Sequence, residues 1–133
     1  MAEIIDKVAW LCIKDRKVLG VRSKGRDTFY TPGGKREGSE TDEQALVREL
    51  KEEISIDLIP GTLKYLNTFT AQAHGKPEGV LVEIKCYSAE YSGELRPQSE
   101  IEEIGWLGSD YFPKAGKPFQ LILTWLKEKD LID

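Results

Sequence analysis

The chain has 133 residues, of which 40% are hydrophobic and 32% charged, and its formal net charge is −4. These values are typical of a globular protein with one domain, which we expect to span residues 1–133. The negative charge argues against nucleic-acid binding, because that requires a basic surface. No apolar run reaches the roughly 20 residues of a membrane-spanning helix, and the N-terminus lacks signal-peptide character, so we expect a cytoplasmic protein.

The chain opens with two predicted strands, residues 7–13 and 18–22, joined by a polar turn at residues 14–17. Cys12 in the first strand and Cys86 in a later one lie in apolar patterns. We expect both to be small buried side chains rather than metal ligands or a disulfide. With a single histidine and no paired cysteines, a zinc site is not expected.

A turn and a helix are predicted next. Residues 30–35 (YTPGGK) should form a strand end followed by a Pro-Gly-Gly turn, where backbone can come close to a ligand. A helix is predicted over residues 42–54, because Thr41 and Gln44 have the spacing of a capping box. Apolar residues recur at every fourth position of this helix, at Leu46, Leu50 and Ile54. One face of the helix should therefore pack on the core.

Three glutamates gather on the other side of this predicted helix. At about 100° per residue, Glu49, Glu52 and Glu53 fall within an arc of roughly 100°. Carboxylates on one rigid helix face suit Mg²⁺ or Mn²⁺ and leave room for water and phosphate oxygens. Taken alone, the triplet fits a solvated acidic face better, because most charge runs lie on the surface.

The spacing around these glutamates changes that interpretation. Residues 34–56 resemble the Nudix box, G-x5-E-x7-R-E-U-x-E-E-x-G-U with U aliphatic, and every fixed position matches except Ser55, where the family has glycine. So long and strict a pattern is a specific signal. By this resemblance the chain is identified as a member of the Nudix hydrolase superfamily. If the helix ends in the left-handed conformation, serine costs about 1–2 kcal/mol there, which affects stability and not metal ligation.

The resemblance implies a site for Mg²⁺, with Mn²⁺ as an alternative. The implied ligands within the box are the carbonyl oxygen of Gly34 and the carboxylates of Glu49, Glu52 and Glu53. Glu49 and Glu53 are also its catalytic candidates, Glu49 as a ligand or as the base that orients the attacking water. Glu40 and Arg48 are implied supporting residues, Glu40 near the metals and Arg48 as a brace for the loop and the glutamates.

Two basic residues are candidates for binding substrate phosphate. Relatives often place a basic residue at the end of the second strand, which here is Arg22, and Lys35 beside the glycine pair is the second candidate. A solvated surface charge is the alternative for each of them.

The second half of the chain is predicted to contain two strands, over residues 63–70 and 80–90, and a final helix over residues 118–131. In the later strand, alternate residues from Val80 to Cys86 share one apolar face. His74, in the connection between the strands, is expected to be a loop residue without a further role, although a histidine there has the chemistry for acid–base work.

One more acidic residue is assigned by the resemblance. Relatives often carry Glu, Glu and Trp at three-residue intervals, and Glu100, Glu103 and Trp106 reproduce this spacing. Glu100 then corresponds to the acid that MutT-type members bring to the metals or to the attacking water, so it is both a ligand and a catalytic candidate. Glu103 is the fallback, and a surface acidic patch is the alternative. Trp106 is expected to lie in the core.

The order of the elements predicts an α+β fold. The resemblance implies the Nudix-type α/β/α sandwich with a mixed, curved β-sheet. The implied reaction is Mg²⁺-dependent hydrolysis of a nucleoside diphosphate linked to X, with a nucleoside triphosphate giving NMP and pyrophosphate as the first choice. Hydrolysis of ADP-ribose, nucleotide sugars or dinucleoside polyphosphates is one alternative, and a non-catalytic nucleotide-binding domain is another.

The resemblance also bears on specificity and partners. MutT enzymes that act on oxidised guanine nucleotides carry a base-reading Asn in the loop where this chain has Gly116. Glycine cannot make those side-chain hydrogen bonds, so oxidised dGTP is not assumed to be the substrate. Many relatives are dimers, and no exposed apolar stripe in the sequence decides for or against a homodimer. A membrane partner is not expected.

Overall fold

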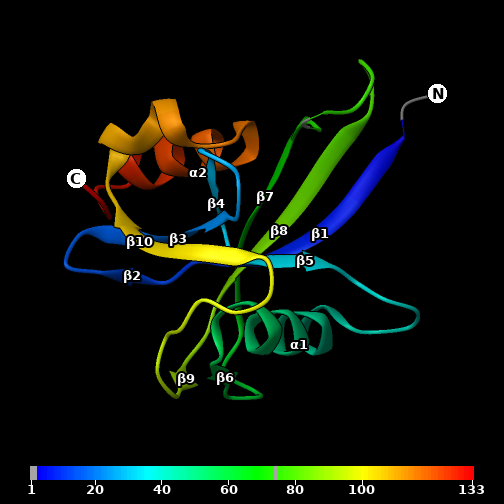
Figure 1. Cartoon of the computed structure of the whole chain (residues 1–133), viewed down its shortest axis with the longest axis vertical. Coiled ribbons are helices and arrows are strands. Elements are labelled where there is room, and N and C mark those ends of the chain that lie inside the picture. Colours follow the sequence, from blue (N-terminus) through cyan, green and yellow to red (C-terminus); the bar gives the residue numbers. More distant parts are fainter. Residues whose placement is uncertain (1–2, 74) are drawn as a thin grey trace.

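The computed structural model describes residues 3–73 and 75–133. Its strands form a central layer between two helices, α1 (Asp42–Ile54) and α2 (Lys117–Glu128), which lie on opposite sides of the layer (Figure 1). This arrangement confirms the predicted α+β class and its layered α/β/α organisation. A short 3₁₀ helix, η1 (Ser109–Lys114), precedes α2.

The first sheet has the strand order β5-β1-β8-β7. Its members are β5 (Gly33–Lys35), β1 (Ile4–Trp10), β8 (Leu81–Ser88) and β7 (Lys64–Gln72). β1 pairs with β8 in parallel, whereas the other neighbours are antiparallel, so this sheet is mixed, as predicted.

The second sheet has the order β10-β3-β2, and β4 also pairs with β3. Its strands are β10 (Ile101–Leu107), β3 (Lys17–Ser23), β2 (Ile13–Lys14) and β4 (Phe29–Tyr30). A separate two-stranded sheet joins β6 (Asp57–Leu58) to β9 (Tyr91–Ser92). The central layer is thus divided between two four-stranded sheets.

Two local predictions differ from the structure for the same reason, which is pairing with distant strands. The single strand predicted over residues 7–13 is divided into β1 and β2, because the chain crosses from the first sheet to the second at Leu11 and Cys12. Leu11 N–H still bonds to Tyr87 O, whereas Cys12 O accepts from Leu19 N–H. The predicted Pro-Gly-Gly turn is also wrong, because the glycine pair belongs to β5 and pairs with β1.

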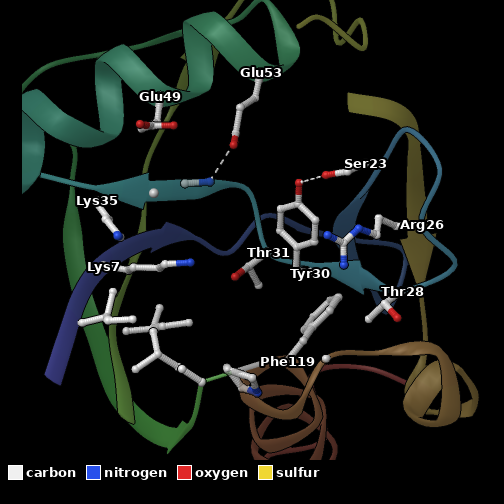
Figure 2. Close-up of a pocket in the computed structure, with 18 of the residues that line it drawn as sticks. Lys7, Ser23, Arg26, Thr28, Tyr30, Thr31, Lys35, Glu49, Glu53 and Phe119 are labelled. Carbon is white, nitrogen blue, oxygen red and sulfur yellow. Dashed lines mark hydrogen bonds between the residues drawn. The ribbon is translucent and has the colours of Figure 1, made fainter. Parts of the chain in front are cut away.

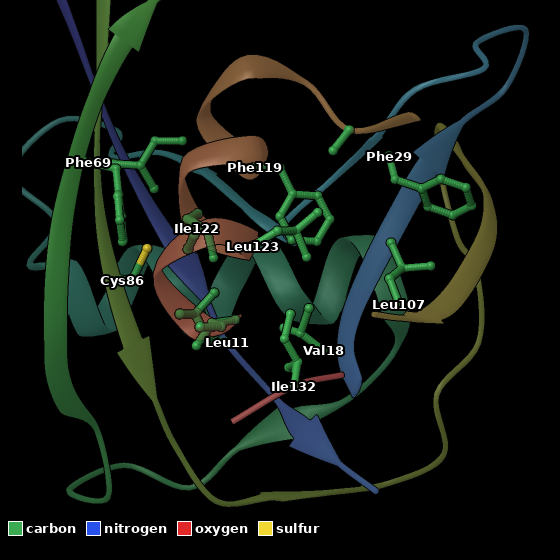
Figure 3. Packing of buried hydrophobic residues seen from close by; sticks show 14 of the residues in the cluster. Leu11, Val18, Phe29, Phe69, Cys86, Leu107, Phe119, Ile122, Leu123 and Ile132 are labelled. Carbon is green, nitrogen blue, oxygen red and sulfur yellow. The ribbon is translucent and has the colours of Figure 1, made fainter. Parts of the chain in front are cut away.

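The central layer separates two apolar cores. Alternation along β1 sends Val8 and Trp10 into the core beneath α1, and Ala9 into the core beneath α2. The α2 core, shown in Figure 3, includes Cys86. Burial raises the pKa of the Cys86 thiol to about 12. Both cysteines are buried and free, as predicted.

Helix α1 begins and ends as the sequence predicts. Thr41 and Gln44 make both hydrogen bonds of a capping box, which satisfies the first free N–H groups of the helix. Ser55 ends the helix at φ 65° and ψ 25°, in the left-handed region where glycine is favoured.

Helix α2 covers the other side of the layer. Pro118 lies in its first turn, and Ile122, Leu123 and Leu126 are fully buried against the sheets. The helix ends at Glu128, three residues before the predicted end. In residues 3–73 and 75–133, no helix is both long enough and apolar enough to cross a membrane.

Candidate active site

A cavity of about 600 Å³ lies between α1, the sheets and the start of α2 (Figure 2). Its acidic lining residues are Glu49, Glu53 and Glu100. Its basic lining residues are Lys7, Arg26, Lys35 and Lys76. Apolar side chains complete the floor and the far end, among them Ile5, Val82, Ile84 and Phe119. The cavity therefore combines carboxylates, basic side chains and an apolar surface within the reach of one small molecule.

Glu53 is the most buried of the acids, with 4% of its surface exposed. Its Oε1 accepts a hydrogen bond from the backbone N–H of Gly33 at 2.9 Å, drawn as a dashed line in Figure 2. Burial raises the pKa of Glu53 to about 8; the hydrogen bond opposes this shift and the neighbouring glutamates add to it. A buried carboxylate crowded by like charges is a group that a divalent cation would stabilise.

Glu49 reaches the cavity because the residue opposite it has no side chain. A Cβ atom at Gly34 would lie 2.7 Å from the carboxyl carbon of Glu49, which is closer than such atoms approach. Gly33 is constrained as well, since its φ is 142° and a Cβ there would lie 2.1 Å from Val8 O. The two glycines thus let β5 lie between β1 and the glutamates of α1.

Arg48 joins the loop before α1 to the helix itself. Its guanidinium donates to both carboxylate oxygens of Glu40, at 2.8 and 2.9 Å, and to Lys35 O at 3.0 Å. It also donates to Glu49 Oε1 at 2.8 Å. The hydrogen bonds from Arg48 lower the pKa of Glu40 to about 2. Arg48 therefore links Glu40 and the backbone of Lys35 to Glu49, and neither Arg48 nor Glu40 lines the cavity.

Glu100 follows the loop that caps the end of α1, where Glu53 lies. Gln98 N–H donates to Glu53 O at 2.8 Å, and Ser99 Oγ donates to Glu52 O at 3.2 Å. These bonds satisfy carbonyl groups that the helix leaves free at its C-terminus. Because Glu100 follows directly, its side chain lines the cavity. The fallback residue, Glu103, lies outside the lining and pairs with Arg22.

Glu52 differs from the other predicted ligands. Its side chain is 56% exposed, lies 3.7 Å from Arg48 Nη1 and is not part of the cavity lining. Within residues 3–73 and 75–133, no three Asp, Glu, His or Cys side chains converge closely enough to hold a metal ion. The donors nevertheless fit a hard cation, because three carboxylates and Gly34 line the same cavity. Side-chain rotation would have to bring them together.

Arg22 and Lys35, the two predicted phosphate-binding residues, are placed differently. Lys35 lines the cavity. Arg22 does not, because its Nε pairs with Glu103 Oε1 at 3.0 Å and its Nη1 donates to Arg26 O at 2.8 Å. Arg22 thus holds the backbone of the residue whose side chain does reach the cavity.

Lys7, Arg26 and Lys76 were not singled out from the sequence. Lys7 lies on the same face of β1 as Ile5, which also lines the cavity. Burial lowers the pKa of Lys7, and the neighbouring charge of Lys35 acts in the same direction. A lysine at an inward position of an apolar strand was the available signal. It was missed because the strand was expected to start at Lys7.

The far end of the cavity is formed by the start of α2. Gly116 lines it, and a Cβ atom there would meet only Thr28 Cγ2 at 3.7 Å and Phe29 O at 4.0 Å. There is room for a side chain at this position, and the chain does not supply one. Tyr30 also lines the cavity, and its hydroxyl hydrogen-bonds with that of Ser23. His74 lies outside the described residues.

Comparisons with known proteins agree with this fold. The family described as NUDIX domain matches residues 6–124. The chain is 32% identical over 113 residues to an ADP-ribose pyrophosphatase of Methanocaldococcus jannaschii, which covers 83% of this chain and 65% of that protein. It is 41% identical over 76 residues to an 8-oxo-dGTP diphosphatase of Proteus vulgaris, covering 57% of this chain and 63% of that one. The chain thus spans less than two thirds of either relative.

Solved structures show the same fold. The E. coli ORF135 protein superposes with a TM-score of 0.73 at 24% identity, over 95% of this chain and 92% of that one. A MutT NUDIX hydrolase from Burkholderia pseudomallei gives a TM-score of 0.67 at 24% identity, over 81% and 85% of the two chains. The family match over residues 6–124 shows that this chain belongs to the Nudix family, and its fold is similar to that of a MutT protein.

Proposed function

We propose that this protein hydrolyses a pyrophosphate bond in a nucleoside triphosphate, releasing NMP and pyrophosphate, in a reaction that depends on Mg²⁺ or Mn²⁺. The observation that carries the proposal is the lining of one cavity by the acidic side chains of Glu49, Glu53 and Glu100 together with basic side chains. Membership in the Nudix family supports the proposal, because the resemblance to that family implies hydrolysis of nucleoside diphosphate derivatives.

The carboxylates would hold the cation. Glu53 and Glu49, with the carbonyl of Gly34 and with Glu100, are the proposed ligands in the cavity wall, and Glu52 would join them by rotating inward from the rim. When bound, the cation would neutralise charge on the phosphate oxygens and lower the pKa of a water molecule. Glu49, Glu53 or Glu100 would orient that water and take its proton, since these three carboxylates line the cavity.

The remaining lining residues would bind the substrate. Lys35 and Arg26 lie on facing sides of the cavity, where they would contact phosphate oxygens (Figure 2). The nucleoside would lie on the apolar floor at Ile5, Val82 and Ile84, next to Phe119. Arg22 would act indirectly, by holding the backbone of Arg26. Arg48 and Glu40 would keep Glu49 in position.

Cleavage of ADP-ribose is the second candidate, because one relative is named an ADP-ribose pyrophosphatase. Such a substrate is also a nucleoside diphosphate linked to X, and the same carboxylates would serve it. A non-catalytic nucleotide-binding role is less favoured, since the three glutamates that the box predicts as metal ligands, Glu49, Glu52 and Glu53, are all present.

A substrate panel tests the proposal. Nucleoside triphosphates, ADP-ribose, nucleotide sugars and dinucleoside polyphosphates are incubated with the protein and Mg²⁺, and the products are separated by chromatography. We expect nucleoside triphosphates to give NMP and pyrophosphate, and the activity to disappear with EDTA and in Glu53→Gln. Release of NDP and phosphate, or turnover only of ADP-ribose, would overturn the choice of substrate. Binding without any turnover would favour the non-catalytic role.

The remaining expectations follow from the sequence. We propose a small-molecule nucleotide as the partner, no nucleic-acid partner and a cytoplasmic location. Size-exclusion chromatography with light scattering distinguishes a monomer of 15.0 kDa from a homodimer.

A further inference from the structure

The arginines of this protein fall into two groups by their ion pairs. Five of the six have a carboxylate within 4.0 Å: Arg16, Arg22, Arg36, Arg48 and Arg96. Among the described residues, Arg26 has no such partner, and it lines the cavity. The three lysines of the lining, Lys7, Lys35 and Lys76, also make no ion pair within residues 3–73 and 75–133. Positive charges are therefore left unpaired at the place where a ligand would bind.

Lys7 and Lys35 are the most closely associated of these charges. They lie directly opposite each other in the antiparallel pairing of β1 with β5. Directly opposite residues share one face of a sheet, and like charges in such a pair repel each other. Figure 2 shows the two side chains next to each other on that face, below Glu49. The fold tolerates this repulsion without giving either ammonium group a carboxylate partner in the described part of the chain.

The residues next to Lys7 in the sheet show that the cavity floor is basic on one side and apolar on the other. In the next strand, Ile84 pairs with Lys7, and Val82 pairs with Ile5. Moving across the sheet from β5 to β8, the cavity floor thus changes from two ammonium groups to an apolar surface. A ligand that fits this floor is strongly anionic at one end and apolar at the other.

We propose that Lys7, with Lys35, binds the terminal phosphate groups of a nucleoside triphosphate and makes the protein select a terminal polyphosphate over an internal diphosphate. This inference rests on the proposed function, and it adds Lys7 as a residue that determines specificity. A terminal phosphate carries a charge of about −1.5 to −2 at pH 7. A phosphate inside a diester-linked diphosphate, as in ADP-ribose, carries one negative charge. Two adjacent unpaired ammonium groups match the first better than the second.

Direct binding of inorganic triphosphate tests the site without requiring turnover. Isothermal titration in metal-free buffer compares the wild-type protein with Lys7→Met, Lys35→Met and the control Lys85→Met. Lys85 lies on β8 opposite Val8, on the face that looks toward α1, so its replacement removes the same charge from the other side of the sheet. We expect a dissociation constant raised roughly 10–100-fold by Lys7→Met and by Lys35→Met, and unchanged by Lys85→Met.

The folded state of the variant needs its own measurement. Lys7→Met removes a like-charge repulsion and adds apolar surface beside Ile84, so its melting temperature should equal or exceed that of the wild type. Weaker triphosphate binding by a protein of undiminished stability then reports the loss of the site. Unchanged triphosphate binding by Lys7→Met would overturn the inference.

Kinetics separate this inference from the proposed function. If nucleoside triphosphates are hydrolysed, Lys7→Met should raise their KM roughly tenfold or more while changing the KM of ADP-ribose much less. Equal effects on both substrates would overturn the proposed selectivity. If the wild type hydrolyses nothing but Lys7→Met still loses triphosphate binding, the proposed reaction fails and the binding site stands.

Discussion

The charged groups on two sides of the cavity differ in whether they are paired. The α1 wall carries Glu49 and Glu53, and the sheet wall carries Lys7 and Lys35. On the α1 wall, Arg48 is bonded to Glu40 and Glu49, and Glu53 is bonded to the backbone of Gly33. On the sheet wall, Lys7 and Lys35 face the cavity without an ion pair among the described residues. Paired charges fix the positions of groups, whereas unpaired charges are available to a ligand. We infer that the α1 wall performs the chemistry and that the sheet wall selects the substrate.

The largest expected effect comes from removing the most buried acid of the α1 wall. Glu53→Gln should lower kcat roughly 10²–10⁴-fold, because it removes a proposed ligand or base while keeping the shape of the side chain. Glu128→Gln, on the exposed end of α2, is the control for the lost charge. Circular dichroism and melting curves check that both variants fold. Full activity in Glu53→Gln would refute the role of the α1 wall.

The same residue should make the metal-free protein less stable at alkaline pH. The pKa of Glu53 is raised from 4.5 to about 8 in the fold, so between these values the unfolded chain releases a proton that the native protein keeps. The free energy of unfolding should therefore fall by a few kcal/mol as the pH rises from about 5 to above 8. Urea unfolding at several pH values measures this slope. Glu53→Gln should flatten it, and identical slopes in both proteins would contradict the assignment.

Arg48 tests whether pairing on the α1 wall positions the catalytic groups. Arg48→Met should lower kcat about 10–100-fold, as expected when a group that orients a ligand is lost. The free energy of unfolding should fall by about 1–3 kcal/mol, because Glu40 and Glu49 lose their partner. Arg48→Lys should restore little of the lost activity, since an ammonium group cannot make the bidentate hydrogen bonds that the guanidinium makes to Glu40. Full rescue by lysine would mean that charge alone matters.

Arg26 and Arg22 allow a matched comparison of two arginines. Arg26 lines the cavity, whereas Arg22 pairs with Glu103 outside it. Arg26→Met should raise the KM for a nucleoside triphosphate about tenfold, because a guanidinium without an ion pair in the described residues is removed from the cavity. Arg22→Met should change it only about twofold, since the Arg22 side chain pairs with Glu103 outside the lining. Steady-state kinetics at fixed ionic strength measure both. A larger effect at Arg22 would restore it as the direct phosphate ligand.

The smallest effect concerns Ser55, which ends helix α1 and does not line the cavity. Ser55 has a φ of 65°, so Ser55→Gly should stabilise the protein by about 1 kcal/mol by relieving the left-handed conformation. Thermal unfolding measures the gain. Activity should stay the same, because the substitution touches neither wall of the cavity. A loss of activity would mean that the helix end positions Glu53 more directly than its hydrogen bonds indicate.

The parts predicted correctly from the sequence are those that local rules determine. The capping box at Thr41, the bounds of α1 and the left-handed Ser55 all depend on residues within one helix. Glu100, assigned to the site from a spacing that relatives share, lines the cavity next to the cap that Gln98 and Ser99 make on α1, and its role stays a prediction.

The parts that the sequence did not predict depend on distant pairing. Nothing near Lys7 indicates that Lys35 will lie opposite it, because that contact comes from the pairing of β1 with β5. Arg22 does not line the cavity because its side chain pairs with Glu103, which lies on β10, far along the chain. The predicted Pro-Gly-Gly turn failed for the same reason, since strand pairing overrides local turn preference.

The most direct test of the account is cation binding by the α1 wall. Mn²⁺ is titrated into wild-type protein and Glu53→Gln, and free Mn²⁺ is followed by electron paramagnetic resonance. The account predicts that the wild type removes Mn²⁺ from the free pool and that Glu53→Gln binds it roughly tenfold or more weakly. Equal affinity in the two proteins, or no binding by either, would contradict a metal site in this cavity.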